Sequence, residues 1–233
     1  MSALGVLVRK ELQATFTAPI AYAVAAVFLL VLGYGFSVTL LSARGGDLTA
    51  MFHQMYVLLV LLVPAVTMRA FAEERKSETL ELLLTAPVSE LAIVVAKFLA
   101  MLALVWSLLV LSVVYVVILA LHGTPDWGPV YGGYVAVFLL ACLLVAVGTL
   151  ISSLTQHQAV AAAASLGVFL VLWLADSVPY PVPPPFDGFV AGLSLLGHFT
   201  SFVSGAVFLS DVGYYVTVSL LALFLTTRVL GDR

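Results

Sequence analysis

Charged residues are scarce in this chain of 233 residues: Asp, Glu, Lys and Arg together make up 9% of it, whereas a soluble domain usually carries about 25%. Hydrophobic residues make up 63%. A soluble fold of this size leaves much of its surface in water and cannot hide so much apolar area. The shortage of charge therefore excludes a soluble globular protein and predicts that lipid is part of the solvent.

Several other absences exclude further classes of function. The single cysteine, Cys142, cannot form an internal disulfide. Lys and Arg are too few for a nucleic-acid interface. The chain has neither a His-Glu-x-x-His zinc motif nor a G-x-x-x-x-G-K-[ST] phosphate loop. We therefore expect no catalysis, no metal and no cofactor on this chain, and any ATP energy must arrive from another polypeptide.

Long apolar runs dominate what is present. A membrane-spanning helix needs roughly 20 apolar residues. Six runs reach or approach that length, and they cover residues 20–41, 51–68, 91–121, 130–154, 159–175 and 212–227. The last two are short and would recruit flanking residues. The sequence predicts an all-α integral membrane protein with six transmembrane helices, folded as a single transmembrane domain over residues 1–233.

The basic residues set the orientation of these spans. Lys and Arg favour the cytoplasmic ends of membrane helices. With six spans and a cytoplasmic N-terminus, eight of the nine basic residues lie inside, and only Arg44 lies outside. We therefore predict that both termini are cytoplasmic.

A seventh apolar stretch, residues 186–209, is interrupted by four glycines. If it crossed the membrane fully, Arg228 and Arg233 would end outside, so we favour a re-entrant or outer-interfacial helical hairpin. Five prolines between residues 179 and 185 predict a stiff, extended segment before it. The outer loop and hairpin together occupy residues 177–211.

Residues 1–17 are predicted to form an amphipathic helix in the cytoplasmic headgroup layer. Its apolar positions fall at helical spacing, and Arg9, Lys10, Glu11 and Gln13 are expected elsewhere on the circumference. The apolar set is Leu4, Leu7, Val8, Leu12 and Phe16.

The inner loop at residues 69–90 holds most of the cytoplasmic charge. Its second half predicts a short helix that Pro87 ends. Ser89 is expected to cap the third span, with Glu90 in the favourable first turn. On this local pattern alone, a solvated charged loop and a docking surface are equally supported.

Ionisable residues are nearly absent from the spans. Because burying one in a bilayer costs about 2.5–3.5 kcal/mol, each would suggest function. Lys97 is the deepest, about two helical turns into the third span, and we expect its stem to carry the ammonium group back to the interface. A proton-coupled pump would carry a buried carboxylate, so this pattern disfavours that class.

Three segments of the chain together resemble the type-2 permease subunits of ABC transporters, in particular the gliding-motility and multicopper-enzyme-maturation type. The most specific is Glu-Glu-Arg-Lys-Ser-Glu-Thr-Leu-Glu-Leu-Leu-Leu-Thr-Ala-Pro-Val-Ser at residues 73–89, which is similar to that family's signature inner loop. The others are residues 10–12 with 19–22 and 33–34, and residues 198–199 with 204–205 and 211–212. The chain departs from the family at Glu78, where Gly is common.

The resemblance implies roles for two groups of residues. The inner loop would contain a coupling helix that docks in a cleft of an ATP-binding subunit, and the outer hairpin would act as a gate. The coupling residues would be Glu73, Glu74, Arg75, Thr79, Leu80, Glu81, Leu82 and Leu83. The outer-gate residues would be His198, Phe199, Ser204 and Asp211.

The resemblance also implies the function and the partners. The chain would be the membrane subunit of an ATP-driven exporter in the bacterial cytoplasmic (inner) membrane, with ATP and Mg²⁺ bound by a partner ABC ATP-binding subunit. A second permease subunit, identical or different, would complete the path, and membrane lipids and an accessory or periplasmic protein are further expected partners. Two alternatives stay open: an ATPase-coupled scaffold that does mechanical work without a transport path, and a stand-alone secondary transporter.

Overall fold

The computed structural model describes residues 3–42, 48–78, 88–122, 125–174, 192 and 194–231. These residues form helices, and no strand occurs among them. Four sequence predictions lie outside the described residues: the coupling positions 79–83, the short helix before Pro87, the proline-rich segment, and the start of the outer hairpin.

Six helices correspond to the six predicted spans, and five of them are long and apolar enough to cross a membrane. In chain order they are α2 (Pro19–Ser42), α3 (Thr49–Thr67), α6 (Glu90–His122), α7 (Trp127–Leu154), α8 (Gln158–Leu174) and α11 (Leu209–Gly231). The sixth, α8, has 17 residues and is about 25 Å long at 1.5 Å per residue. The predicted all-α membrane fold is confirmed.

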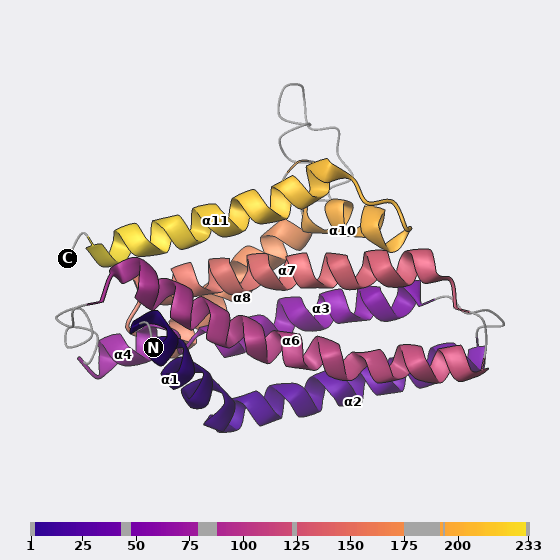
Figure 1. Ribbon diagram of the computed structural model, residues 1–233, viewed down its shortest axis with the longest axis horizontal. Helices are drawn as coiled ribbons and strands as arrows, with labels where there is room; N and C mark the ends of the chain where they lie inside the picture. The colour runs from indigo at the N-terminus through magenta and orange to yellow at the C-terminus, as the bar shows by residue number, and fades with distance from the viewer. Residues whose placement is uncertain are drawn as a thin grey trace.

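The helices lie side by side along one axis, and α7 is at the centre (Figure 1). It packs against α3, α6, α8 and α11. Small residues on α7 permit these contacts: a side chain at Gly133 would meet the ring of Phe52, and one at Gly148 would meet Thr67. Close approach at small residues is how membrane helices gain packing contacts, because lipid gives no hydrophobic drive between them.

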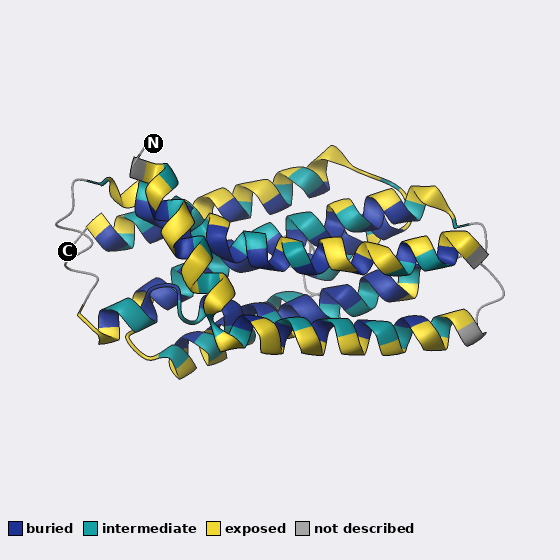
Figure 2. Cartoon of the chain, turned by 60° about the horizontal axis from the view of Figure 1, so that its bottom comes forward, coloured by how far each residue is buried: buried dark blue, intermediate teal, exposed yellow. Residues whose placement is uncertain are grey.

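The outward faces of the bundle are apolar and exposed, whereas the buried residues face inward (Figure 2). Leu30, Val110 and Leu220 are each more than 60% exposed. In a soluble protein an apolar surface this continuous would aggregate or bind a partner. Here it is the surface that a lipid bilayer covers.

One end of the bundle carries two short polar helices, α1 (Ala3–Thr17) and α4 (Ala72–Lys76), together with the last turn of α11 (Figure 1). Helix α1 crosses the bundle and packs on α6 and α2. Ser89 caps α6 as predicted, since its Oγ accepts from the backbone N–H of Ala92 at 3.3 Å. Following the orientation predicted from the basic residues, we refer to this end as the inner end.

The opposite, outer end is completed by α10 (Leu195–Val203), which packs mainly on α7 (Figure 1). Its nine residues give about 14 Å, far short of the roughly 30 Å of a bilayer core. Tyr56 of α3 contacts both Trp173 at the end of α8 and Phe199 of α10. Helix α10 therefore begins where the short helix α8 stops, then runs outward and turns back into α11.

The turn after α10 sits tightly on the first turns of α7. A side chain at Gly132 would meet the backbone carbonyl oxygen of Phe202. The turn residue Gly205 has φ of +86° and lies beside Gly128 and Pro129. Because a backbone carbonyl cannot move aside as a side chain can, glycine at position 132 is required for this contact.

We predict that Gly132→Ala loosens α10 and destabilises the protein by about 1–3 kcal/mol, the usual cost of overpacking. Gly167→Ala on α8 is the matched control, because a Cβ there meets nothing within 4 Å and alanine favours a helix over glycine. Thermal unfolding in detergent measures both variants. Equal effects at the two positions would contradict this account of the α10 contact.

Candidate functional site

The inner loop leaves the membrane through a turn that one buried hydroxyl holds in place. Ser152 of α7 donates to the carbonyl of Met68 at 3.1 Å and accepts from the backbone N–H groups of Phe71 and Ala72 at 3.1 and 3.2 Å. These backbone groups lie at the end of α3, in the turn and at the start of α4, where no hydrogen bond within a helix pairs them. Ser152 therefore fixes α4 to the central helix.

Helix α4 begins directly after this turn and carries the first three predicted coupling residues. Arg69 and Glu73 form a bidentate pair at 2.7 and 2.9 Å, one helical turn apart. Glu73 points along the surface of the protein, with its side chain 46% exposed. Arg75 is buried. Of the three, Glu73 is thus the most accessible.

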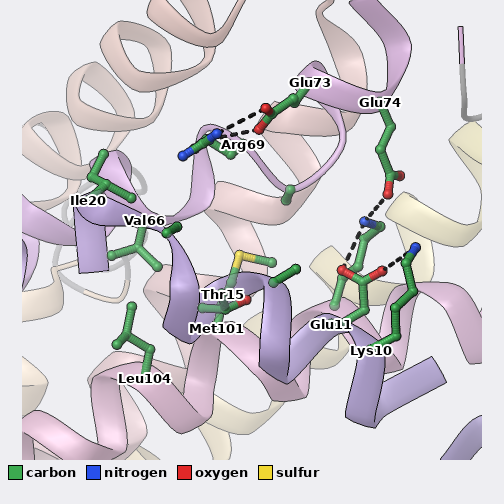
Figure 3. A pocket seen from close by; sticks show the side chains of 14 residues that line it. Lys10, Glu11, Thr15, Ile20, Val66, Arg69, Glu73, Glu74, Met101 and Leu104 are labelled. Atoms are coloured by element: carbon green, nitrogen blue, oxygen red, sulfur yellow. Dashed lines mark hydrogen bonds and ion pairs between the residues drawn. The ribbon is translucent and has the colours of Figure 1, made fainter. Parts of the chain in front are cut away.

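Glu74 turns inward and meets the most deeply buried cation of the inner end. Its Oε1 accepts from Nζ of Lys97 at 2.7 Å, and Oε2 of Glu11 accepts from the same ammonium at 3.2 Å. The ammonium also lies 5.3 Å from the ring centre of Phe71, in the range of a cation–π contact. Lys97 thereby joins α6 to α4 and α1, and the two ion pairs are drawn as dashed lines in Figure 3.

Two sequence predictions are wrong at this point. The ammonium group of Lys97 does not reach water at the interface, because its side chain is only 4% exposed and is paired inside the protein. Glu11 does not lie away from the packed face of α1. It is buried one turn after Leu7, on the face that packs against α6. The reason is the same in both cases: each charge satisfies the other, so neither needs water.

The residue just before the undescribed part of the loop has an uncommon backbone conformation. Glu78 has φ of +58°, in the left-handed region where glycine has no steric penalty. This is the position at which the family that the sequence resembles commonly has Gly. The chain thus makes the turn that glycine would make, with a residue less suited to it.

A cavity of about 360 Å³ lies beside the Lys97 cluster, between α1, α3, α4 and α6 (Figure 3). Charged side chains from all but α3 line one part of it, and apolar side chains line the rest. The lining residues are Lys10, Glu11, Ala14, Thr15, Ala18, Ile20, Val66, Arg69, Ala70, Glu73, Glu74, Lys97, Met101 and Leu104.

Two of the predicted outer-gate residues meet directly. His198 Nδ1 lies 2.8 Å from Oδ1 of Asp211, and its Nε2 lies 3.3 Å from the carbonyl oxygen of Gly192. The imidazole stacks on Tyr214 with ring centres 4.3 Å apart. Both ring nitrogens of His198 therefore have an oxygen partner within hydrogen-bond distance. The pair fastens α10 to the start of α11.

The other two predicted outer residues lie apart from this pair. Phe199 is fully buried against Tyr56 of α3. Ser204 is exposed at the end of α10, where its hydroxyl donates to the carbonyl of Ser201 at 2.7 Å. The structure therefore gives Phe199 an anchoring position and Ser204 a position in the turn.

The Lys97 cluster could have been anticipated in part from the sequence. A lysine two turns inside an apolar helix needs a counter-charge, and acidic residues are present on both neighbouring inner segments. Which of them would supply it depends on how α1 crosses the bundle, and the sequence gives no sign of that angle. Within the described ranges, no group of three or more His, Cys, Asp or Glu side chains is placed to hold a metal ion.

Comparison with known proteins agrees with this architecture. The chain matches the model of the family described as ABC-2 family transporter protein over residues 6–226, nearly its whole length. No curated protein matches the chain. The matched range includes both the Lys97 cluster and the His198–Asp211 pair.

We predict that Lys97→Met destabilises the protein by about 3–5 kcal/mol, because it leaves Glu11 and Glu74 without their buried counter-charge. Lys10→Met is the matched control, since the Lys10 side chain is 59% exposed and a surface pair contributes about 0–1 kcal/mol. Thermal unfolding in detergent, with proteolysis of α1 as a second measurement, tests this. If both variants unfold alike, Lys97 is not what holds α1.

We predict that Glu78→Gly stabilises the protein by about 1 kcal/mol, because it removes the left-handed strain of a residue with a side chain. For a chain of this size the gain corresponds to a melting temperature roughly 2–4 °C higher. Glu78→Val should have the opposite effect, since a β-branched residue tolerates positive φ poorly. If Glu78→Val stabilised the protein, the charge of residue 78 and not its backbone conformation would determine stability at this position.

Proposed function

Since this chain belongs to the ABC-2 family of transporter proteins and is therefore the membrane permease subunit of an ABC transporter, we propose that it couples ATP hydrolysis by a separate subunit to export of a substrate. The membrane would be the bacterial cytoplasmic membrane, with both termini inside. ATP and Mg²⁺ would be bound by the ATP-binding subunit. A second permease subunit would complete the path.

The observation that carries this proposal is the continuous set of contacts leading inward from the loop. Helix α4 is hydrogen-bonded to α7 through Ser152 and ion-paired to α6 through Glu74 and Lys97. Lys97 continues the connection to α1 through Glu11. A push on residues 78–88 therefore reaches two spans and the inner amphipathic helix through short, directional contacts.

Such contacts suit a rigid-body movement. Hydrogen bonds and ion pairs fix the relative positions of α4, α6 and α7, so a displaced loop would tilt these helices together rather than deform one of them. The exposed carboxylate of Glu73 and the loop residues Thr79, Leu80, Glu81, Leu82 and Leu83 would contact the ATP-binding subunit. Arg75 would steady α4 from its buried position.

The outer end would supply the gate. His198 and Asp211 hold α10 to α11, and Phe199 holds α10 to α3. When the spans tilt, these attachments would carry α10 with α11 and open the outer side. Ser204 would lie at the moving turn.

The coupling assignment predicts that Leu82→Asp weakens assembly with the ATP-binding subunit by about 2 kcal/mol or more, roughly 30-fold in affinity, because it places a charge in an apolar contact. Glu81→Ala and Glu74→Ala should lower the ATPase stimulation that the permease gives its partner. Co-purification measures the first effect, and phosphate release in liposomes measures the second.

Gln13→Ala is the control for these variants, because Gln13 is an exposed residue of α1 outside the loop. If Leu82→Asp, Glu81→Ala and Glu74→Ala all preserve both assembly and ATPase stimulation, residues 69–90 are not the coupling segment.

A further inference from the structure

The cavity beside the Lys97 cluster has two chemically different halves (Figure 3). Ile20, Val66, Met101 and Leu104 make one half apolar. Charged side chains make the other half, and they come from α1, α4, α6 and the turn before α4. A ligand that fills both halves must itself be amphipathic.

The position of the cavity indicates where such a ligand comes from. It lies at the junction of α1 with α2, where Ala18 and Ile20 line it. Helix α2 is an apolar span that begins at Pro19, whereas α1 is the polar helix at the inner end. The junction therefore coincides with the inner boundary of the apolar belt, the depth at which lipid headgroups meet their acyl chains.

The charges around the cavity sum to zero, since Lys10, Arg69 and Lys97 match Glu11, Glu73 and Glu74. An anionic headgroup would gain from the cations but would be repelled equally by three carboxylates. A zwitterionic headgroup can meet both signs at once. Arg69 and Glu73 present a guanidinium and a carboxylate side by side, with 35% and 46% of the side chains exposed.

The carboxylates further select among zwitterionic headgroups. A primary ammonium group donates hydrogen bonds to a carboxylate such as that of Glu73, and charged hydrogen bonds of this kind are the stronger ones. A quaternary ammonium group has no N–H to donate. The guanidinium of Arg69, directly beside Glu73, suits the phosphate of the same headgroup.

We propose that this cavity binds one inner-leaflet phospholipid with a primary-amine zwitterionic headgroup of the phosphoethanolamine class. The phosphate lies against Arg69, the ammonium against Glu73, and the upper part of one acyl chain against Met101 and Leu104. A volume of about 360 Å³ is at the lower end of small-molecule sites, roughly 300–1,000 Å³, and suits a headgroup with part of a chain. This site shares Glu73 with the coupling segment proposed above, and its test requires neither export nor the ATP-binding subunit.

The test is lipid binding to the purified chain in detergent, followed by native mass spectrometry with short-chain phosphatidylethanolamine, phosphatidylcholine and phosphatidylglycerol. We expect one phosphatidylethanolamine per chain to be retained in preference to the other two. Equal retention of all three would identify ordinary annular lipid. Preferential retention of phosphatidylglycerol would show that the cations alone determine which lipid binds. Either result overturns the proposal.

Two pairs of variants locate the site. Arg69→Gln should weaken phosphatidylethanolamine binding roughly tenfold, the effect of losing one charged hydrogen bond, whereas Arg228→Gln, at an exposed position on α11, should not. Ala14→Trp should block the cavity that Ala14 lines, whereas Gln13→Trp, its exposed neighbour outside the lining, should not.

Each variant is first checked for unchanged thermal unfolding, and Ala14→Trp, which removes no charge, separates loss of the site from loss of the ion pairs. Binding that survives both Arg69→Gln and Ala14→Trp would overturn the assignment. The last measurement compares the binding of the lipid with that of glycerophosphoethanolamine, which is the headgroup without acyl chains. If it binds as tightly as the lipid, the apolar half contributes nothing and the ligand is not a membrane lipid.

Discussion

The inner end of this protein depends on the burial of one ammonium group. Lys97 lies within an apolar helix, where an unpaired charge costs several kcal/mol, and it is tolerated because Glu11 and Glu74 approach it from two other helices. The same need for pairing decides the arrangement around it: α1 must present Glu11 inward, and α4 must follow α3 closely enough for Glu74 to arrive. Three segments far apart in the sequence are thereby fixed to one another, in addition to the packing of α1 on α6.

Much of the fold could be predicted from the sequence because it depends on local composition. Each of the six predicted spans has a corresponding helix, and the Ser89 cap follows from a local rule. The candidate site was harder to predict from the sequence, because it depends on how the helices pack against one another. The sequence identifies Lys97 as the deepest cation, but the expectation that its ammonium group reaches water is wrong, since it pairs with residues 86 and 23 positions away in the chain. Helix α4 was not predicted, because five residues are too few to show a helical periodicity. The role of Ser152 was not predicted either, because nothing in the local sequence distinguishes a serine that hydrogen-bonds three backbone groups of another segment.

The two ends of the bundle are held by different kinds of contact. At the outer end, Gly132 admits a backbone carbonyl and Phe199 is fully buried against α3, so close packing adds to the His198–Asp211 pair in fixing α10. At the inner end, ion pairs and hydrogen bonds dominate. These contacts are directional, and Ser152 and the Glu74–Lys97 pair together fix α4 to α7 and α6. Helices α4, α6 and α7 are therefore suited to move as a unit.

On the function proposed above, these contacts also bear on how the inner end would receive a push. The loop is joined to α7 through Ser152 and to α6 through Lys97, so a displacement of α4 would pass to both spans. A cavity lies beside this buried charge, and its lining carries three cations and three carboxylates. A neutral headgroup with both charges suits such a lining, because it adds one charge of each sign. The ion-paired junction and the proposed headgroup therefore obey the same constraint, that a charge taken out of water needs a partner of the opposite sign.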